Sequence, residues 1–340
     1  MAIKLKEIAE KANVSISTVS RIINNQGNFS EDTRRKVLEL ANEYLRPGIA
    51  PFRLSGIAYS IAVFVPDAND FFDNDPASST DLNDLKEQFE SQGHQFHLAA
   101  RTADFHSSSS AYRLLGEKKF DAAVVFDPFI EDKLVEELIQ RGIPYVVTNG
   151  RSFETSHNFI DYDNRKGAAE VIDYLYELGH RRIGLIAGPS RHLVNENRLR
   201  GCRDAFLERG LEWDDTKVFS GAFDPAHGYQ AAKRLMSEHP DTTAIFAFND
   251  MIAFGAMKGL AEMKLKVPKD VSLVGFDDLK LSEFMMPPLT TVRRFKYDIS
   301  PLIVKMLTEL IANKYISEVN ISLKTELIER ESCGKVSVKG

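Results

Sequence analysis

Apolar residues recur with a helical period near the N-terminus and in short continuous runs farther along the chain. The first pattern is a stripe at intervals of three and four residues, formed by Leu5, Ile8, Ala9 and Ala12. Such a stripe predicts a helix with one buried face. From Ile57 onward, β-rich runs alternate with amphipathic segments, which predicts a larger α/β body behind a small all-α head.

A second helix is predicted directly after the first. Asn13 interrupts the first stripe at a position that suits a left-handed turn residue. The hydroxyl of Ser15 can cap a helix over 16–24, in which we expect Val19 and Ile23 to pack on the first helix. Two short helices around a tight turn are typical of a helix-turn-helix unit, which lays its second helix in the major groove of DNA.

A third helix is predicted after the loop at 25–29, with Ser30 as its cap and acidic Glu31 and Asp32 favouring its dipole. Its apolar face consists of Thr33, Val37, Leu40, Ala41 and Tyr44. The alternative is a plain three-helix bundle with a polar surface, and the string IAEKANVSISTVSRIIN (8–24) argues against it.

Charge placement fits contact between the head and phosphate. The chain has a formal net charge of −6, but residues 1–56 hold nine Lys or Arg and six Asp or Glu. The head is therefore basic and the rest of the chain acidic, which favours local binding of DNA and discourages binding by the body.

Other function classes find little support in the sequence. It has no apolar run of 18 residues and no apolar core of a signal peptide, so we expect a cytosolic protein without a membrane span. Cys202 and Cys333 match no metal spacing and are expected to be reduced thiols. No catalytic Ser/His/acid set, zinc spacing or phosphate loop indicates an enzyme, and no metal or other cofactor is expected. His180 is interpreted as structural, at a helix end.

The body is predicted to contain parallel sheets. Its strand candidates include 60–65, 94–99, 121–126, 144–148, 182–187, 243–248 and 271–276, with helices at 133–141, 165–178 and 226–238. Apolar strands alternating with helices predict a doubly wound α/β fold, which binds ligands at the carboxyl ends of its strands. Enzymes and binding proteins share this architecture, so the pattern alone assigns no function.

The head and body together resemble the LacI/GalR repressor family. The head carries the family pattern at Ile8-Ala9, Ala12, Val14-Ser15, Thr18 to Arg21 and Ile23-Asn24. The matching strings of the body are FVPDANDFF (64–72), YELGHRRIGLIAGP (176–189), NRLRGCRDAF (197–206), AIFAFNDMIAFGAM (244–257), VPKDVSLVGFDDL (267–279) and PPLTTVRR (287–294). The resemblance reaches about Glu331 and implies a periplasmic-binding-protein-like body with two doubly wound parallel-sheet lobes.

The resemblance also implies which residues contact an operator. These are Leu5, Ser15, Ile16, Ser17, Thr18, Ser20, Arg21, Asn24 and Leu54. Ile16 and Ser17 would occupy the two variable places that choose bases, whereas Thr18, Ser20 and Asn24 would hold phosphates. Lys4 stands before the predicted first helix, where the family has a capping Thr, at a cost of about 1 kcal/mol.

The hinge departs from the family pattern. Leu54 aligns with the Leu that wedges into the minor groove in the family, where a short hinge helix folds on DNA. Here Gly48 and Pro51 replace the usual Asn and Ala, and the segment is one residue short. Because proline is tolerated only in the first turn of a helix, a hinge helix would begin near Ala50. The hypothesis is that Leu54 still inserts.

The implied organisation is a DNA-binding domain at 1–46, a hinge at 47–57 and an effector-binding and dimerisation domain at 58–340. Lobe one is expected at about 58–160 and 291–320, and lobe two at about 161–290 and 321–340. A homodimer is expected because one head reads too few bases, and twofold symmetry matches a pseudo-palindromic operator.

The implied ligand-binding residues lie at predicted strand ends: Asp67, Phe71, Phe72, His192, Val194, Arg198, Phe223, Asn249 and Asp277. The fork of Arg198 suits vicinal hydroxyls, a carboxylate or a phosphate, and Asp277 can accept two hydroxyl hydrogen bonds. Alternatively, Arg198 and Asp277 are ion-pair partners, Phe223 is core and Asn249 is a helix cap.

Aromatic walls with Arg, Asp and Asn favour a sugar ligand. The segment LVNENRLRG (193–201) is most similar to maltose-type repressors, and His192 stands where the nucleobase-binding branch has Arg. The prediction is therefore a sugar-responsive repressor. The rival reading is a sugar-binding transport protein without a DNA function, which the helix-turn-helix disfavours.

Overall fold

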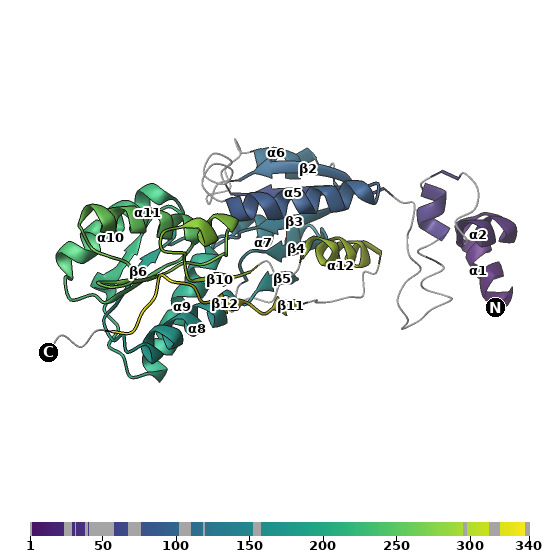
Figure 1. Cartoon of the computed structure of the whole chain (residues 1–340). Coiled ribbons are helices and arrows are strands. Elements are labelled where there is room, and N and C mark those ends of the chain that lie inside the picture. The colour runs from purple at the N-terminus through teal and green to yellow at the C-terminus, as the bar shows by residue number, and fades with distance from the viewer. Residues whose placement is uncertain are drawn as a thin grey trace.

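The computed structural model contains a helical head and a body of two lobes, which follow one another along the molecule (Figure 1). It describes residues 2–23, 29–30, 32–37, 40, 58–66, 76–101, 110–117, 120–151, 158–294, 298–312 and 320–336. The predicted fold class, an all-α head with an α/β body of two parallel-sheet lobes, is confirmed.

The head is built on two helices around a tight turn, α1 (Ala2–Ala12) and α2 (Ile16–Ile23). Asn13 adopts the predicted left-handed conformation between them, with φ of 58°. The buried apolar residues of the head are Ile8, Ala9, Ala12, Val19, Ile22 and Val37. The expectation for Lys4 is wrong, because α1 begins at Ala2 and Lys4 lies inside the helix.

The first lobe surrounds a six-stranded sheet in the order β11-β5-β4-β3-β1-β2, with all neighbouring strands parallel. Its strands are β1 (Ser60–Val65), β2 (Gln95–Ala100), β3 (Ala122–Phe126), β4 (Tyr145–Thr148), β5 (Phe159–Tyr162) and β11 (Asn320–Leu323). Its helices are α5 (Pro76–Ser91), α6 (Ser110–Glu117), α7 (Lys133–Gln140) and α12 (Ser300–Ala312).

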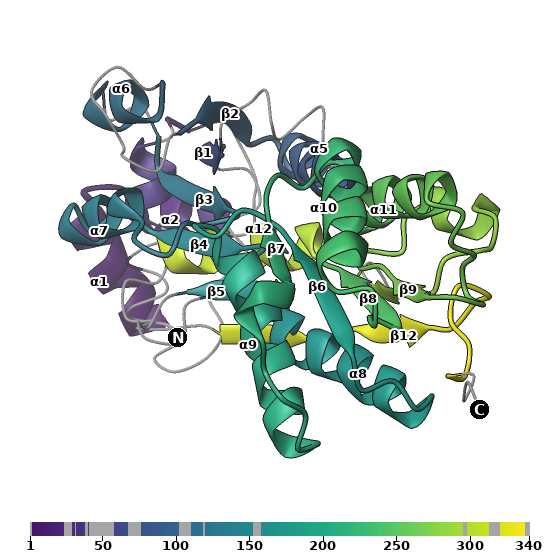
Figure 2. The same cartoon turned by 90° about the vertical axis from the view of Figure 1, so that its left-hand side faces the viewer.

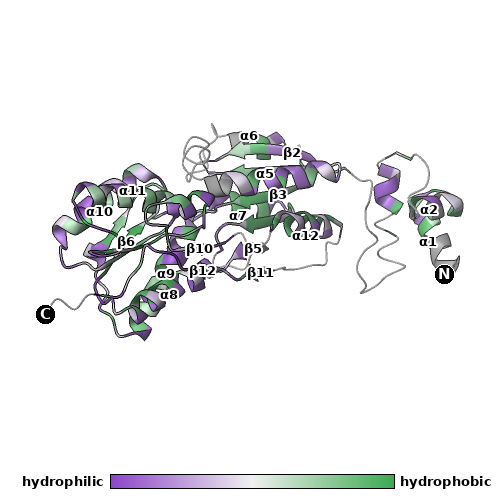
Figure 3. Ribbon diagram, in the orientation of Figure 1, coloured by the Kyte–Doolittle hydropathy of each residue, from purple (hydrophilic) through white to green (hydrophobic). Residues whose placement is uncertain are grey.

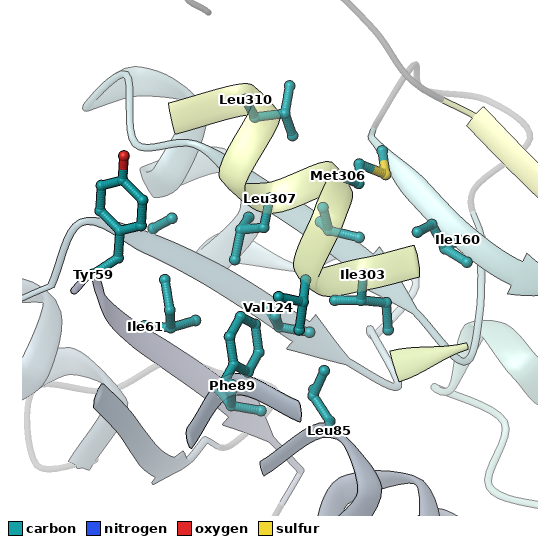
Figure 4. Packing of buried hydrophobic residues seen from close by; sticks show 14 of the residues in the cluster. Tyr59, Ile61, Leu85, Phe89, Val124, Ile160, Ile303, Met306, Leu307 and Leu310 are labelled. Atoms are coloured by element: carbon teal, nitrogen blue, oxygen red, sulfur yellow. The ribbon is translucent and has the colours of Figure 1, made fainter. Parts of the chain in front are cut away.

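Successive side chains of β1 belong to two different apolar clusters, so helices cover both faces of this sheet. Ile61 and Val63 belong to the apolar cluster with Leu85 of α5 and Leu307 of α12 (Figure 4). Phe64 belongs to a separate cluster with residues of α6 and α7. A strand buried on both faces needs a continuous apolar run, which is the pattern of 60–65. Figure 3 shows that the strands are mostly apolar, whereas the helices combine apolar and polar residues.

The second lobe holds a four-stranded parallel sheet in the order β7-β6-β8-β9. Its strands are β6 (Ile183–Ala187), β7 (Val218–Ser220), β8 (Ala244–Ala247) and β9 (Ser272–Val274). Helices α8 (Asn164–Glu177) and α9 (Leu193–Glu208) cover one face, and α10 (Pro225–Glu238) and α11 (Asp250–Glu262) cover the other (Figure 2). Short 3-10 helices lie at η1 (Asp215–Lys217) and η2 (Lys280–Phe284).

The chain leaves the second lobe through an antiparallel pair of strands, β10 (Thr291–Arg293) and β12 (Glu326–Ile328). Between them the chain returns to the first lobe to form α12 and β11. Each of the seven predicted strand segments contains a strand, and the predicted body helices match α7, α8 and α10. Strands β5, β7, β10, β11 and β12 were not predicted.

Close packing of α8 against α9 depends on Gly201. A Cβ atom at this position would overlap the carbonyl oxygen of Arg165. We expect Gly201→Ala to lower the free energy of unfolding by about 1–3 kcal/mol, because backbone cannot move aside as a flexible side chain can. Gly116→Ala on α6 is the control, since a Cβ there meets no atom within 4 Å. Denaturant unfolding that shows equal stability for both variants would contradict this packing.

Candidate DNA-binding and effector sites

Helix α2 presents a polar surface that begins at its cap. The amide of Thr18 donates to the hydroxyl of Ser15 at 3.0 Å, as the sequence predicts for a capping serine. The Ser15 hydroxyl also lies 2.8 Å from the hydroxyls of Ser17 and Thr18. Ile16 is 47% exposed, although it is a large apolar residue. Short polar groups and one exposed aliphatic side chain therefore share the N-terminal end of α2.

Arg21 is exposed on the same helix. Its guanidinium lies 5.4 Å from the centre of the Phe29 ring, at a distance suited to a cation–π contact. Phe29 therefore supports the position of Arg21, a role that the sequence did not indicate. Of the predicted DNA contacts, Asn24, Leu54 and the side chains of Leu5 and Ser20 lie outside the described residues.

A small cavity lies between the two lobes. Its lining residues are Asp127, Asn149, Val194, Arg198, Phe223, Asn249, Asp277 and Arg294. The structure thus brings five of the predicted ligand residues together with three that were not predicted. Asp127 follows β3 and Asn149 follows β4, so the cavity lies at the carboxyl ends of parallel strands, where doubly wound sheets bind ligands. Asp67, Phe71 and Phe72 lie outside the described residues.

Arg198 has protein partners for each of its donor groups. Its Nε donates to Asn164 at 3.0 Å, Nη1 donates to the carbonyl of Phe248, and Nη2 donates to Asp277 at 3.4 Å. The guanidinium lies 3.8 Å from the centre of the Phe276 ring. Arg198 therefore forms the ion pair with Asp277 that was considered as the alternative, and it also lines the cavity.

Arg294 joins the two lobes across the floor of the cavity. Its Nε donates to the Asp277 carboxylate of lobe two at 2.7 Å, and its Nη1 donates to Asn149 at the end of β4 at 2.7 Å. Arg294 and Asp277 are 2% and 3% exposed, so these bonds form away from water, where they are strong.

Backbone geometry fixes Asp277 at the cavity. Asp277 and Asp278 both have positive φ, 116° and 57°, a conformation that non-glycine residues seldom adopt. Two arginines hold the second carboxylate, since Arg293 Nε and Arg330 Nη2 each donate to Asp278 at 2.6 Å. These charge-assisted bonds compensate for the strain of the turn and set the direction of Asp277.

Asn249 and Phe223 each combine a structural role with a place in the cavity wall. Asn249 caps α11, because its Oδ1 accepts from the amide of Ile252 at 2.8 Å, and its Nδ2 donates to the carbonyl of Phe223 at 3.3 Å. The half-buried Phe223 ring packs on Gly188, where a Cβ atom would overlap it. The capping alternative for Asn249 is thus observed together with a position at the cavity.

The lobes also contact each other beside the cavity. His192 Nδ1 lies 2.6 Å from Asp127 Oδ2, and the His192 ring meets the edge of Phe129 at 5.0 Å between centres. The other carboxylate oxygen of Asp127 is buried without a hydrogen-bond partner in the described structure. A hydroxyl donor is the kind of group that satisfies a buried acceptor such as this one. His192 itself contacts Asp127 rather than lining the cavity.

A buried carboxylate of β5, Asp161, is 1% exposed. One oxygen accepts from the Tyr162 amide at 2.8 Å, while the other has no hydrogen-bond partner among the described residues. Burial raises the pKa of Asp161 to about 7, against the opposing effect of Arg294.

The described residues give no sign of two other kinds of site. No described helix is long and apolar enough to cross a bilayer. Within the same ranges, no group of three or more His, Cys, Asp or Glu is placed to hold a metal ion. His180 lies between the hydroxyl of Thr243 and the carbonyl of Gly334, 3.0 Å from each, in keeping with a structural role.

Two family models match the chain. Residues 4–44 match the model described as bacterial regulatory proteins, lacI family, and residues 172–333 match the periplasmic binding protein-like domain. The HTH-type transcriptional regulator CelR of Thermobifida fusca is 30% identical over 334 residues, which cover 96% of this chain and 97% of CelR. The regulator DegA of Bacillus subtilis (strain 168) is 32% identical over 298 residues, 86% of each protein.

Two solved structures are also similar to this chain. The CelR–cellobiose complex matches with a TM-score of 0.73 at 30% identity, covering 96% of this chain and 99% of that one. The lac repressor dimer bound to operator and the anti-inducer ONPF has a TM-score of 0.72 at 24% identity, covering 96% and 98%, and shows the shared fold.

Asp161 predicts a pH-dependent difference in stability. Its folded pKa of about 7 exceeds its ordinary value of 3.8, so the stability that its protonated form provides is lost as pH rises between these values. Asp161→Asn does not titrate and should gain on the wild type, by on the order of 2 kcal/mol between pH 5.5 and 7.5. Thermal melting at several pH values measures this gain. A constant difference, or an equal gain in the exposed Asp270→Asn control, would contradict it.

Proposed function

Because this chain belongs to the LacI family of bacterial transcription regulators, we propose that it represses carbohydrate genes under the control of a small sugar. The observation that carries the proposal is a polar cavity between two lobes, behind a head whose α2 exposes Ile16, Ser17 and Arg21. We assign 1–46 to DNA binding, 47–57 to the hinge and 58–340 to effector binding and dimerisation.

In the proposed complex, α2 enters the major groove of the operator. Ile16 and Ser17 meet base edges, and Arg21 reaches a base or phosphate from its place beside Phe29. Thr18 contacts the phosphate backbone, which orients the helix without reading sequence. Leu54 inserts into the minor groove between paired heads. Because bacterial DNA lies in the cytoplasm, we propose that the protein acts there.

The charges of the cavity favour a neutral ligand. Arg198 and Arg294 already donate to protein acceptors, so an anionic ligand would have to displace those bonds. Asp127 keeps a buried oxygen that can accept from a hydroxyl. Phe223 supplies an apolar wall for a sugar ring. Since CelR was solved with cellobiose, cellobiose is our first candidate, and maltose is the second.

Ligand control follows from a two-state equilibrium of the lobes. The cavity is lined from both lobes, so a bound sugar favours the arrangement in which both sets of residues reach it. Its differential affinity for the two arrangements sets how far operator binding can change. A sugar-binding protein without a DNA function would show the same closure but no operator complex.

Operator and sugar binding are tested together by gel shift with the gene's own promoter, with and without cellobiose or maltose, alongside a thermal-shift screen of sugars. We expect Arg198→Ala to weaken sugar binding at least about 30-fold, a loss of about 2 kcal/mol, because Arg198 lines the cavity and holds Asp277 in place there. Operator binding without sugar should remain in this variant.

Arg203→Ala on the same helix is the matched control, since Arg203 is exposed and does not line the cavity. Equal sugar affinity in the Arg198 and Arg203 variants would place the ligand elsewhere. Sugar binding without any shifted promoter would favour the solute-binding alternative.

We also propose the surface through which two copies pair. Leu281, Phe284 and Met286 are 54%, 69% and 91% exposed and lie on η2 and the turn after it. Clustered apolar side chains of this kind mark an interface. A second copy is the occupant that suits them, because a palindromic operator needs two heads and the similar lac repressor was solved as a dimer.

Phe284→Asp should therefore shift the monomer–dimer equilibrium at least tenfold toward monomer, since a charge would be buried in the interface. Sedimentation equilibrium measures the change. Leu207→Asp is the control, because Leu207 is 82% exposed on α9, away from η2. If the Leu207 variant dissociates and the Phe284 variant does not, the pairing surface is wrong.

A further inference from the structure

One buried carboxylate, that of Asp250, anchors the segment that follows β9. Asp250 lies in the first turn of α11 and is 0% exposed. Its Oδ2 accepts from the amide of Leu279 at 2.7 Å and from the hydroxyl of Ser282 at 2.6 Å. Its Oδ1 accepts from the hydroxyl of Thr291 at 2.5 Å. Three donors from a segment of 13 residues therefore converge on one side chain.

The stretch of residues 277–286, which includes two of these donors, has two ends with different tasks. At one end Asp277 lines the cavity in a strained conformation, and at the other end Phe284 and Met286 form the exposed apolar surface. The bonds to Leu279 and Ser282 lie between these ends. Asp250 itself is buried and is absent from the cavity lining, so it acts on both ends through the segment.

Two further observations show how closely Asp250 is built into this segment. A Cβ atom at Gly275 would overlap the Asp250 carboxylate, so the chain passes directly over it. Burial, together with the nearby Asp277 carboxylate, raises the pKa of Asp250 to about 7. An acid kept in so unfavourable a place is retained for its hydrogen bonds, which an apolar residue could not make.

We propose that Asp250 is a positioning residue that couples the effector cavity to the pairing surface by holding residues 277–286 in one arrangement. The inference rests on the proposed function for the roles of the two ends. When two copies pair through Phe284, the order imposed on η2 reaches Leu279 and Asp277 through Ser282, by the bond from its hydroxyl to Asp250 and by the bond from its amide to the carbonyl of Leu279. By linkage, order imposed by a ligand at Asp277 favours pairing to the same extent.

Hydrogen exchange tests this coupling without a known ligand. In the full-length wild type, the amides of residues 275–279, which precede the pairing surface, should exchange at least tenfold more slowly than in monomeric Phe284→Asp. In Asp250→Asn that dependence should fall below threefold, because only the backbone bond from Ser282 to Leu279 then links η2 to these amides. A merely structural Asp250 would accelerate exchange but leave the tenfold dependence on pairing. Exchange that is the same in the wild type and Phe284→Asp would also overturn the proposal.

Two more variants complete the test. Ser282→Ala keeps the bond from the Leu279 amide to Asp250 and the bond from the Ser282 amide to Leu279. It removes only the hydroxyl bond to Asp250, so it should also reduce the dependence below threefold even if Asp250→Asn fails to fold. Asp214→Asn is the matched control, because Asp214 accepts from the Thr216 amide at 2.9 Å in another part of the lobe. It should preserve the dependence. If Phe284→Asp stays dimeric, the coupling is overturned, while gel shifts and sugar binding still test the proposed function separately.

Discussion

The arrangement of the cavity depends on the charge cluster of Arg294, Asp277 and Arg198. Arg294 donates to one lobe through Asp277 and to the other through Asn149, so one planar group fixes the distance between them. The bonds are buried, and loss of one partner would leave an uncompensated charge in a dry environment, typically at a cost of 3–5 kcal/mol. The relative position of the lobes is therefore tied to residues that line the cavity.

A second contact between the lobes lies beside this cluster. Besides the pair of His192 and Asp127, the amide of Ile130 donates to the carbonyl of Arg191 at 2.9 Å, and the amide of Leu193 donates to Pro128 at 3.0 Å. These bonds join the turn after β3 to the start of α9. An effector that changes the arrangement of the lobes must break these bonds in addition to forming its own contacts. Its effect depends only on the difference between its affinities for the two arrangements of the lobes.

Local sequence predicted the buried strands that are continuous apolar runs, such as β1 and β3, because an apolar run is required wherever helices cover both sides of a sheet. It missed the buried β5, in which Asp161 interrupts the run. It missed β11, whose residues alternate between exposed and half-buried at the edge of the sheet. The head was predicted through its stripe and caps, and the structure adds Ile22 as a buried residue beside Val19, while the side chain of Ile23 lies outside the described residues.

Only part of the cavity was predicted, because some of its residues are identified only by contacts with partners far away in the sequence. Asp127 and Asn149 follow predicted strands and could have been found by the rule that located Asn249, whereas Arg294 is identified only by its distant partners. His192 was assigned to the ligand through the family resemblance. Its contact with Asp127 spans 65 residues of sequence, and local pattern carries no signal for such a pair.

The late return of the chain to the first sheet has a consequence for biogenesis. Strand β11 pairs with β5, although 157 residues separate Tyr162 from Asn320, and α12 covers β1 from a similarly remote position. A ribosome must therefore release almost the entire polypeptide before this sheet can close. Until then the apolar edge of β5 and the uncovered face of β1 are open to chaperones, and a nascent chain stalled before Asn320 would be a substrate for quality-control proteases.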